Sequence, residues 1–219
     1  MALSNRQPRE RAYGQDRNLT AVDRFGVWLS SLQINRHVPT FAKKRVADIG
    51  CGFEARFART LIDRAEHVTL LDVALDPRLK EEPRVTAIEG VIPGALSSIA
   101  TGGTDVLICN SVLEHLWEPG AALAEFHRML APGGVALINV PSWRGKYFLE
   151  LSAFRLRRSP ADEMNDHKMY YDPRDLWPLV VKAGFMPSDI RCFRHKFGLN
   201  TFAVCTKAGP AVTAAKERN

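Results

Sequence analysis

Two aspartates and two glycines have the spacing of a site for a nucleotide-like ligand. Asp48 is followed by Gly50 and Gly52, and Asp72 comes 20 residues after Gly52. Glycines let the backbone approach a ligand closely because they carry no Cβ. Asp48 ends an apolar strand pattern, where an unpaired buried carboxylate would be costly, so it needs polar partners or a cationic ligand. The simpler alternative is that Asp48 caps the following turn and that Asp72 is an ordinary turn residue.

A second group of side chains could take part in acid–base chemistry. Asn110 and Ser111 precede Glu114 and His115 in one segment, and His167 lies in the later run D-H-K-M-Y-Y. Histidine titrates near neutral pH and can accept a proton from a hydroxyl or an amine. We therefore expect His167 to act as a general base or to position the molecule that carries the hydroxyl or amine. His115 is a second candidate. Alternatively, Glu114 only interacts favourably with the dipole of a helix that begins near it, His115 packs in the core and His167 lies in a surface loop.

Alternating strand and helix patterns would position these residues at one edge of a sheet. Apolar runs predict strands at 46–49, 67–71, 85–88, 105–109, 135–140, 190–194 and 202–206. Helical spacing or helix-capping residues predict helices at 19–32, 55–65, 120–130 and 173–183. Strands that alternate with helices indicate an α/β fold, a mainly parallel sheet covered on both faces.

The chain divides into one domain with two less regular ends. Residues 1–17 are expected to form a flexible basic arm, 18–207 a single domain, and 208–219 a loose tail. Residues 141–171 have no continuous period apart from a helix-like piece at 147–156. Because long irregular connections are usually functional, we predict that this segment is a lid forming the acceptor pocket. A basic cluster in this segment would either face an anionic acceptor or lie on the solvent-exposed surface; it comprises Arg155, Arg157 and Arg158.

Composition narrows the class of protein. The net charge of +6 and pI of about 9.3 permit an acidic partner, but mild basicity gives no firm nucleic-acid signal. No apolar run is long enough to span a bilayer, and residues 1–17 lack the apolar stretch of a secretory signal. The four cysteines have no zinc-site spacing, which predicts free thiols, a cytoplasmic location and no metal site.

Three segments together resemble the class I S-adenosylmethionine-dependent methyltransferases, in particular their type 11/12-like members. V-A-D-I-G-C-G at 46–52 resembles motif I of that family, in which the acid precedes the first glycine. N-S-V-L-E-H-L at 110–116 is similar to the segment after the fourth strand, and L-A-P-G-G at 130–134 to the turn before the fifth. The resemblance covers residues 45–207 and implies a doubly wound, Rossmann-like, seven-stranded sheet with an antiparallel last strand.

The resemblance also implies a cofactor, S-adenosylmethionine, and a role for each matching residue. Asp48, Gly50 and Gly52 would hold its methionine portion, Asp72 and Val73 the ribose hydroxyls, Gly90 and Val91 the adenine, and Asn110 and Ser111 would lie near the sulfonium. Two positions depart from the family pattern: Glu54 replaces a third glycine, and Val91 replaces an acid that accepts a hydrogen bond from adenine. Backbone groups, or Glu89, would then have to bind the adenine.

The expected function is methyl transfer to a small-molecule or sugar-like acceptor, at oxygen. One alternative is a noncatalytic S-adenosylmethionine-binding module or partner subunit. Another is a nicotinamide-dependent oxidoreductase, because G-C-G-F-E-A also fits the loose dinucleotide pattern G-x-G-x-x-G/A. The position of Asp48 before the first glycine argues against the oxidoreductase. The motifs name neither the acceptor nor an oligomeric state.

Overall fold

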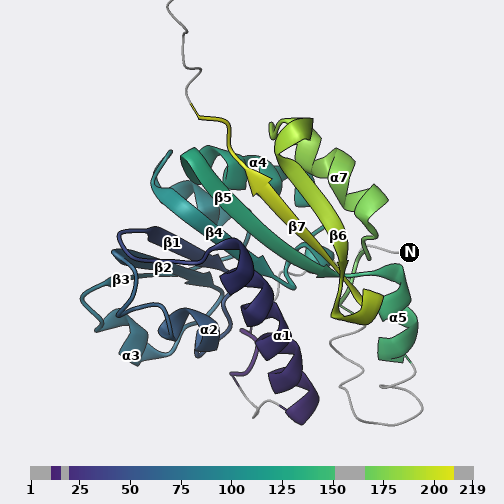
Figure 1. The fold of residues 1–219 in the computed structure, drawn as a ribbon. Helices are drawn as coiled ribbons and strands as arrows, with labels where there is room; N and C mark the ends of the chain where they lie inside the picture. Colours follow the sequence, from purple (N-terminus) through teal and green to yellow (C-terminus); the bar gives the residue numbers. More distant parts are fainter. Residues whose placement is uncertain (1–10, 16–19, 151–165, 210–219) are drawn as a thin grey trace, which may run out of the picture.

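The sheet predicted from the sequence is present, with helices on both faces (Figure 1). The computed structural model describes residues 11–15, 20–150 and 166–209. The strands are β1 (Arg45–Ile49), β2 (His67–Asp72), β3 (Val85–Glu89), β4 (Thr104–Asn110), β5 (Leu130–Pro141), β6 (Ile190–His195) and β7 (Asn200–Thr206). They lie in the order β3-β2-β1-β4-β5-β7-β6; β7 is antiparallel to both neighbours, and the other pairs are parallel. The mainly parallel sheet with an antiparallel last strand is therefore confirmed.

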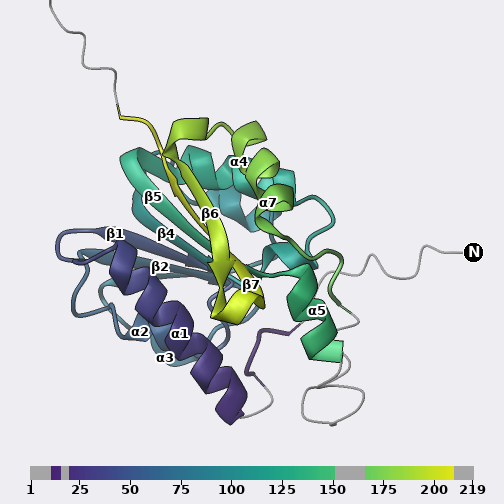
Figure 2. The ribbon, with the colours of Figure 1, turned by 45° about the vertical axis from the view of Figure 1, so that its right-hand side comes forward.

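The helices divide between the two faces of the sheet (Figures 1 and 2). One face carries α1 (Ala21–His37), α2 (Arg56–Arg59) and α3 (Pro77–Lys80), and the other carries α4 (Pro119–Met129) and α7 (Pro173–Lys182). A further helix, α5 (Trp143–Glu150), follows the end of β5. Neighbouring residues of β1 belong to different cores, since Val46 packs with the α1 side and Ala47 with the α4 side. This is the doubly wound arrangement that the sequence predicted.

Capping residues fix where two of the long helices begin. The N–H of Asp23 donates to the Thr20 hydroxyl at 3.2 Å, and the N–H of Thr20 donates to the Asp23 carboxylate at 2.9 Å, a capping box. At α7, the N–H of Asp172 donates to Asp175 at 2.9 Å, and Pro173 occupies the first helical position. Both helices thus begin directly after residues whose side chains cap the first turn.

The helix expected at 55–65 is wrong in length. Only Arg56–Arg59 is α-helical, although the apolar residues expected on its inner stripe, from Ala55 to Ala65, are all buried. The hydroxyl of Thr60 donates to the carbonyl of Phe57 at 2.7 Å, and the Thr60 N–H donates to the same carbonyl at 2.9 Å. A side chain that bonds to its own backbone competes with the helical ladder, so the chain continues as tighter turns.

The strand expected at 135–140 is also longer than the sequence indicated, because it begins at Leu130. Residues 131–134, expected as a separate turn, lie within β5 as an irregularity. Thr104 pairs with Leu130, but Val106 pairs with Val135, so the two strands use different numbers of residues here. At Gly134 a Cβ would lie 2.9 Å from a carbonyl oxygen of the same loop, so the close backbone approach requires glycine.

The apolar stripe expected on the first helix does not face the core. Phe25, Trp28 and Leu32 are about half exposed, and the core contact of α1 comes from Ile34 near the end of the helix. Periodicity marks an apolar face but does not say what that face contacts. Within the described residues, no helix is long and apolar enough to cross a membrane.

Residues 11–15 contact the domain, which corrects the expectation of a flexible arm over 1–17 for this stretch. Ala12 is buried, and the N–H of Phe53 donates to the carbonyl of Tyr13 at 2.9 Å. A Cβ at Gly52 would lie 3.1 Å from that same carbonyl oxygen. The chain before α1 therefore packs directly on the glycine turn after β1.

Candidate active site

A cavity of about 1550 Å³ opens at the carboxyl ends of the parallel strands. Its wall includes the ends of β1, β2 and β4, the loop after β3, and residues of α1 and the 166–168 segment. In a doubly wound sheet, ligands bind at this edge, where the strand order reverses between β1 and β4. Pockets for one small ligand are usually smaller, so this volume can hold two molecules.

Asp48 lies buried in the wall of this cavity. Its side chain is only 4% exposed, beside Leu70 and Ile108 in the neighbouring strands. Burial and the nearby charge of Asp72 raise the pKa of Asp48 to about 7. Within the described part of the chain, no group gives its carboxylate a hydrogen bond or an ion pair. The turn-capping alternative is therefore not supported, and the Asp48 carboxylate is available to a cationic ligand in the cavity.

The two glycines of the first turn both adopt left-handed backbone conformations. Gly50 has φ +72° and Gly52 has φ +77°. A Cβ on Gly50 would collide with the side chain of Val112, so this position is closed to any other residue by both backbone and space. Ala55, which ends the turn, is also left-handed, at φ +44°. The turn is thus sharply constrained and leads directly from β1 into the cavity wall.

Asp72 joins the end of β2 to this turn. Its two carboxylate oxygens accept hydrogen bonds of 2.8 Å each, one from the N–H of Gly52 and one from the N–H of Val73. The N–H of Gly90 in turn donates to the carbonyl of Asp72 at 2.9 Å. Asp72 therefore supports the turn and also lies in the cavity wall. The sequence analysis treated a turn residue and a ligand-binding residue as alternatives.

The loop after β3 supplies the next part of the wall. Gly90 and Val91 line the cavity, and Val91 is 47% exposed. A Cβ on Gly90 would lie 2.7 Å from the Cβ of Ala95, so the turn requires glycine. Glu89 does not line the cavity, because its carboxylate binds Lys80 at 2.8 Å and the N–H of Leu75 at 2.9 Å. The suggestion that Glu89 reads adenine is therefore wrong.

Asn110 and Ser111 line the cavity as expected, and a third residue, Asn139, joins them. Asn139 of β5 is the register partner of Asn110 in β4. Its carbonyl accepts from the N–H of Ser111 at 2.8 Å, while its side-chain amide is buried and makes no hydrogen bond within the described residues. Sequence analysis missed Asn139, although an Asn inside the apolar run V-A-L-I-N-V was a usable signal.

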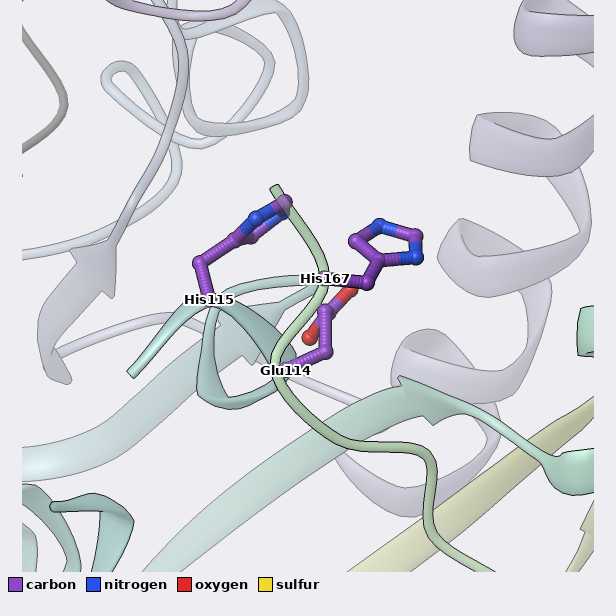
Figure 3. A group of neighbouring side chains, drawn as sticks. All are labelled: Glu114, His115 and His167. Atoms are coloured by element: carbon purple, nitrogen blue, oxygen red, sulfur yellow. The ribbon is translucent and has the colours of Figure 1, made fainter. Parts of the chain in front are cut away.

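The two candidate histidines both line the cavity and lie close to each other (Figure 3). Their ring centroids are 4.8 Å apart in an edge-to-face arrangement. Nδ1 of His115 lies 2.9 Å from Oδ2 of Asp166, and Nδ1 of His167 lies 3.1 Å from the hydroxyl of Tyr170. Although burial raises the pKa of Asp166, its contacts with His115 and Lys168 outweigh that effect and lower it to about 2. The structure thus unites two segments that the sequence could only treat separately.

Glu114 adds a carboxylate to this pair. It is 1% exposed, and one ligand atom each from Glu114, His115 and His167 lie within 4.8 Å of one another. The sequence predicted no metal site because its cysteines lack the spacing of one. Spacing along the chain does not reveal this group, since His167 comes from a distant segment.

Comparison with known proteins settles the family. A family model described as a methyltransferase domain matches residues 23–187. The chain belongs to this methyltransferase family. A ubiquinone biosynthesis O-methyltransferase of Psychrobacter arcticus is 26% identical over 159 residues, covering 68% of this chain and 62% of the relative. Its counterpart in Aeromonas salmonicida is 26% identical over 155 residues, covering 67% of this chain and 65% of the relative.

The chain thus spans less than two thirds of the length of these two relatives. Among solved structures, a SAM dependent methyltransferase from Archaeoglobus fulgidus matches with a TM-score of 0.59 and 15% identity, covering 82% of this chain and 94% of that chain. At this identity the likeness shows the fold. The family match favours the methyltransferase over the nicotinamide oxidoreductase that the glycine pattern also allowed.

S-adenosylmethionine is the cofactor of this methyltransferase domain, and the residues present fit it. Asp48 is a buried carboxylate with no cationic partner among the described residues, and the cofactor carries a positive amino group and a positive sulfur. Asn139 offers a buried amide beside Asn110. Gly50 and Gly52 line the cavity with backbone that carries no side chain. Each of these features suits a polar, cationic ligand at the ends of β1, β4 and β5.

Lys196 is a further cavity residue of the methyltransferase domain that sequence analysis missed. It follows β6, and Lys196, Phe197 and Gly198 have successive left-handed φ values of +50°, +58° and +83°. This turn brings the ammonium close to α1, since a Cβ on Gly26 would lie 3.7 Å from it. Burial lowers the pKa of Lys196 to about 8, opposed by the charge of Glu114. A polar, glycine-containing turn is expected between β6 and β7, but the left-handed conformation of Lys196 and Phe197 does not follow from their residue types.

Proposed function

We propose that this protein transfers a methyl group from S-adenosylmethionine to a hydroxyl oxygen of a small molecule. The observation that carries the proposal is that one cavity is lined by Asp48, by the glycine turn and by the histidines His115 and His167. Both curated relatives are named as O-methyltransferases, which favours oxygen as the acceptor atom.

The cofactor side is proposed to act by binding and alignment. Asp48 would place its carboxylate against the positive end of the cofactor, and Asp72 with Val73 would hold the ribose hydroxyls. Backbone groups of Gly90 and Val91 would bind the adenine, and Asn110 and Ser111 would lie near the sulfur. When bound, S-adenosylmethionine supplies a methyl group activated by a positive sulfur, so the protein has to position the acceptor and exclude water.

The acceptor side is proposed to lie around the histidine pair. His167 and His115 would position the acceptor hydroxyl, and the neighbouring ring of Trp117 offers it an apolar surface. The ammonium of Lys168 lies 5.4 Å from the centroid of that ring, and Lys196 adds a second cation to the wall. Because Lys168 also pairs with Asp166 at 3.1 Å, the proposal of a negatively charged acceptor rests on Lys196.

Part of the predicted lid contributes to this wall. Pro141, Gly145 and Phe148 line the cavity from one end of the 141–171 segment, and Asp166, His167 and Lys168 line it from the other. Its role as an acceptor lid is part of the proposal. The basic cluster Arg155, Arg157 and Arg158 lies outside the described residues.

The alternative is a noncatalytic cofactor-binding module. A screen of phenols, vicinal diols and sugars with methyl-labelled S-adenosylmethionine separates the two. The proposal expects label in a methyl ether, with one S-adenosylhomocysteine released per methyl transferred. Cofactor binding without turnover on any member of the panel would favour the module instead. A cytoplasmic location stays a prediction, in keeping with four cysteines that are all free.

A further inference from the structure

We propose that Glu114, His115 and His167 bind one divalent transition-metal ion at the acceptor end of the cavity. The site itself is inferred from geometry alone, while its role toward an acceptor rests on the proposed function. Two imidazoles and one carboxylate form a ligand set that zinc, manganese and ferrous iron all accept, with positions left open for other oxygens. The three ligand atoms are no more than 4.8 Å apart (Figure 3).

This spread is compatible with a single ion after small side-chain rotations. Nitrogen and oxygen ligands lie about 2.0–2.2 Å from such a metal, so two of them on one ion are about 3–4 Å apart. Closing the cluster therefore needs movements of about 1 Å. Rotations of imidazole and carboxylate groups produce such movements without a change of backbone.

The backbone already holds the two segments of the site together. Glu114 and His115 lie in a short 3₁₀ turn, Leu113–His115, after β4. The N–H groups of Lys168 and Met169 both donate to the carbonyl of Glu114, at 2.6 and 3.3 Å. Next along the chain, the hydroxyl of the buried Tyr171 donates to the carbonyl of Leu113 at 3.4 Å. The segment that carries His167 is thus joined directly to the turn that carries the other two ligands.

Each histidine also has an outer partner of the kind that orients metal ligands. Asp166 lies 2.9 Å from Nδ1 of His115, and the hydroxyl of Tyr170 lies 3.1 Å from Nδ1 of His167. Metal-binding histidines characteristically use one ring nitrogen for such a partner, which fixes the tautomer and leaves Nε2 as the ligand atom. Both rings thus have a polar group next to Nδ1, so Nε2 of each ring is the proposed ligand atom.

The burial of Glu114 is compatible with a cation bound beside it. A carboxylate that is 1% exposed is stabilised by a neighbouring cation or by hydrogen bonds. The competing source of that charge is Lys196, whose pKa is raised by Glu114 against the effect of burial. The two explanations differ in whether the protein binds metal.

A metal here would define the acceptor more closely. Three protein ligands leave coordination positions toward the cavity, and oxygens are suitable ligands for them. An acceptor with two adjacent oxygens, one of them the hydroxyl to be methylated, could occupy two such positions. The inference therefore adds a chemical class, vicinal oxygen donors, to the proposed function.

The test is direct metal binding to the full chain, freed of any histidine tag and stripped with chelator. Calorimetry with Zn²⁺ and with Mn²⁺ should show one ion per chain at micromolar affinity or better. Glu114→Gln and His167→Ala should each weaken binding at least tenfold. His67→Ala is the matched control, because His67 lies at the opposite end of the sheet, where it contacts Thr86, and it should bind as the wild type does.

Melting curves of each variant check folding, and His115→Ala provides a second ligand variant if Glu114→Gln does not fold. Absence of stoichiometric binding in the wild type, or equal affinity in the ligand variants and the control, would overturn the inference. Full methyl transfer after chelation, with no metal bound, would overturn the metal's role and leave the proposed function intact. Failure to bind S-adenosylhomocysteine would instead count against the function and not against the metal.

Discussion

The carboxylate of Asp72 accepts a 2.8 Å hydrogen bond from the backbone N–H of Gly52, and thereby joins the end of β2 to the turn after β1. The predicted ligand-binding acid is thus also a support for the glycine turn. Removing it should affect both the cofactor site and the fold.

Asp72→Ala is expected to lose about 1.5–3 kcal/mol of unfolding free energy, the usual value for hydrogen bonds to a charged group. It should also weaken S-adenosylhomocysteine binding. Urea unfolding and calorimetry measure the two effects. Asp63→Ala, at an exposed aspartate outside the cavity, is the control and should change neither. An Asp72→Ala protein with wild-type stability would show that the 2.8 Å contact contributes nothing.

Asp48 makes the stability of the cofactor-free protein depend on pH. Burial and the charge of Asp72 raise its pKa in the fold to about 7, above the ordinary aspartate value of 3.8. The folded protein therefore holds this proton more tightly than the unfolded chain, so the stabilisation is present at low pH and is lost as pH rises from about 4 to 7.

Asp48→Asn should remove this pH dependence and raise the melting temperature at pH 8, because no charge is then buried. The same change should weaken cofactor binding at least tenfold. Melting temperatures from pH 5 to 8, compared between wild type and variant, measure the effect. Parallel curves for the two proteins would contradict the assignment of the pKa to Asp48.

Gly50 and Gly102 allow backbone strain to be separated from crowding. Both have left-handed backbones, with φ of +72° and +66°, but only a Cβ on Gly50 would collide with a neighbour. Gly102→Ala should cost about 1–2 kcal/mol. Gly50→Ala should cost clearly more and abolish cofactor binding, since Val112 has to move. If the two variants lose similar amounts of unfolding free energy in urea, the collision with Val112 does not destabilise the protein.

Lys196 is predicted to recognise a negative charge on the acceptor. Lys196→Met should raise KM for an anionic acceptor at least fivefold, with cofactor affinity and KM for a neutral analogue unchanged. Lys43→Met is a matched control, because Lys43 is also left-handed, at φ +58°, but is exposed and outside the cavity. Steady-state kinetics on the paired acceptors decides the matter, and equal increases in KM for both would mean that Lys196 acts through packing.

Local patterns predicted the features that depend on neighbours in sequence. The strand ends, the turn with Gly50 and Gly52, and the start of α7 at Asp172 all follow from apolar runs, glycines and capping residues. The 20-residue spacing from Gly52 to Asp72 predicted their proximity, because one strand-to-strand crossover separates them.

Features that depend on tertiary contacts could not be predicted from local sequence patterns. The engagement of Glu89 with Lys80 and the outward face of α1 result from packing between elements. Asn139 lies in the cavity because β5 is in register with β4. The meeting of Glu114 with His167 depends on backbone hydrogen bonds between segments more than fifty residues apart.

The central claim is that the cavity beside Asp48 and the glycine turn binds S-adenosylmethionine. The most direct measurement is the melting temperature of the full chain with S-adenosylhomocysteine, compared with a nicotinamide dinucleotide. Ligand at 100 times Kd adds about 2.7 kcal/mol of stability, or roughly 5–11 °C for a domain of this size. We predict that shift for S-adenosylhomocysteine and none for the dinucleotide. An unchanged melting curve with S-adenosylhomocysteine, together with a clear shift for the dinucleotide, would contradict the claim.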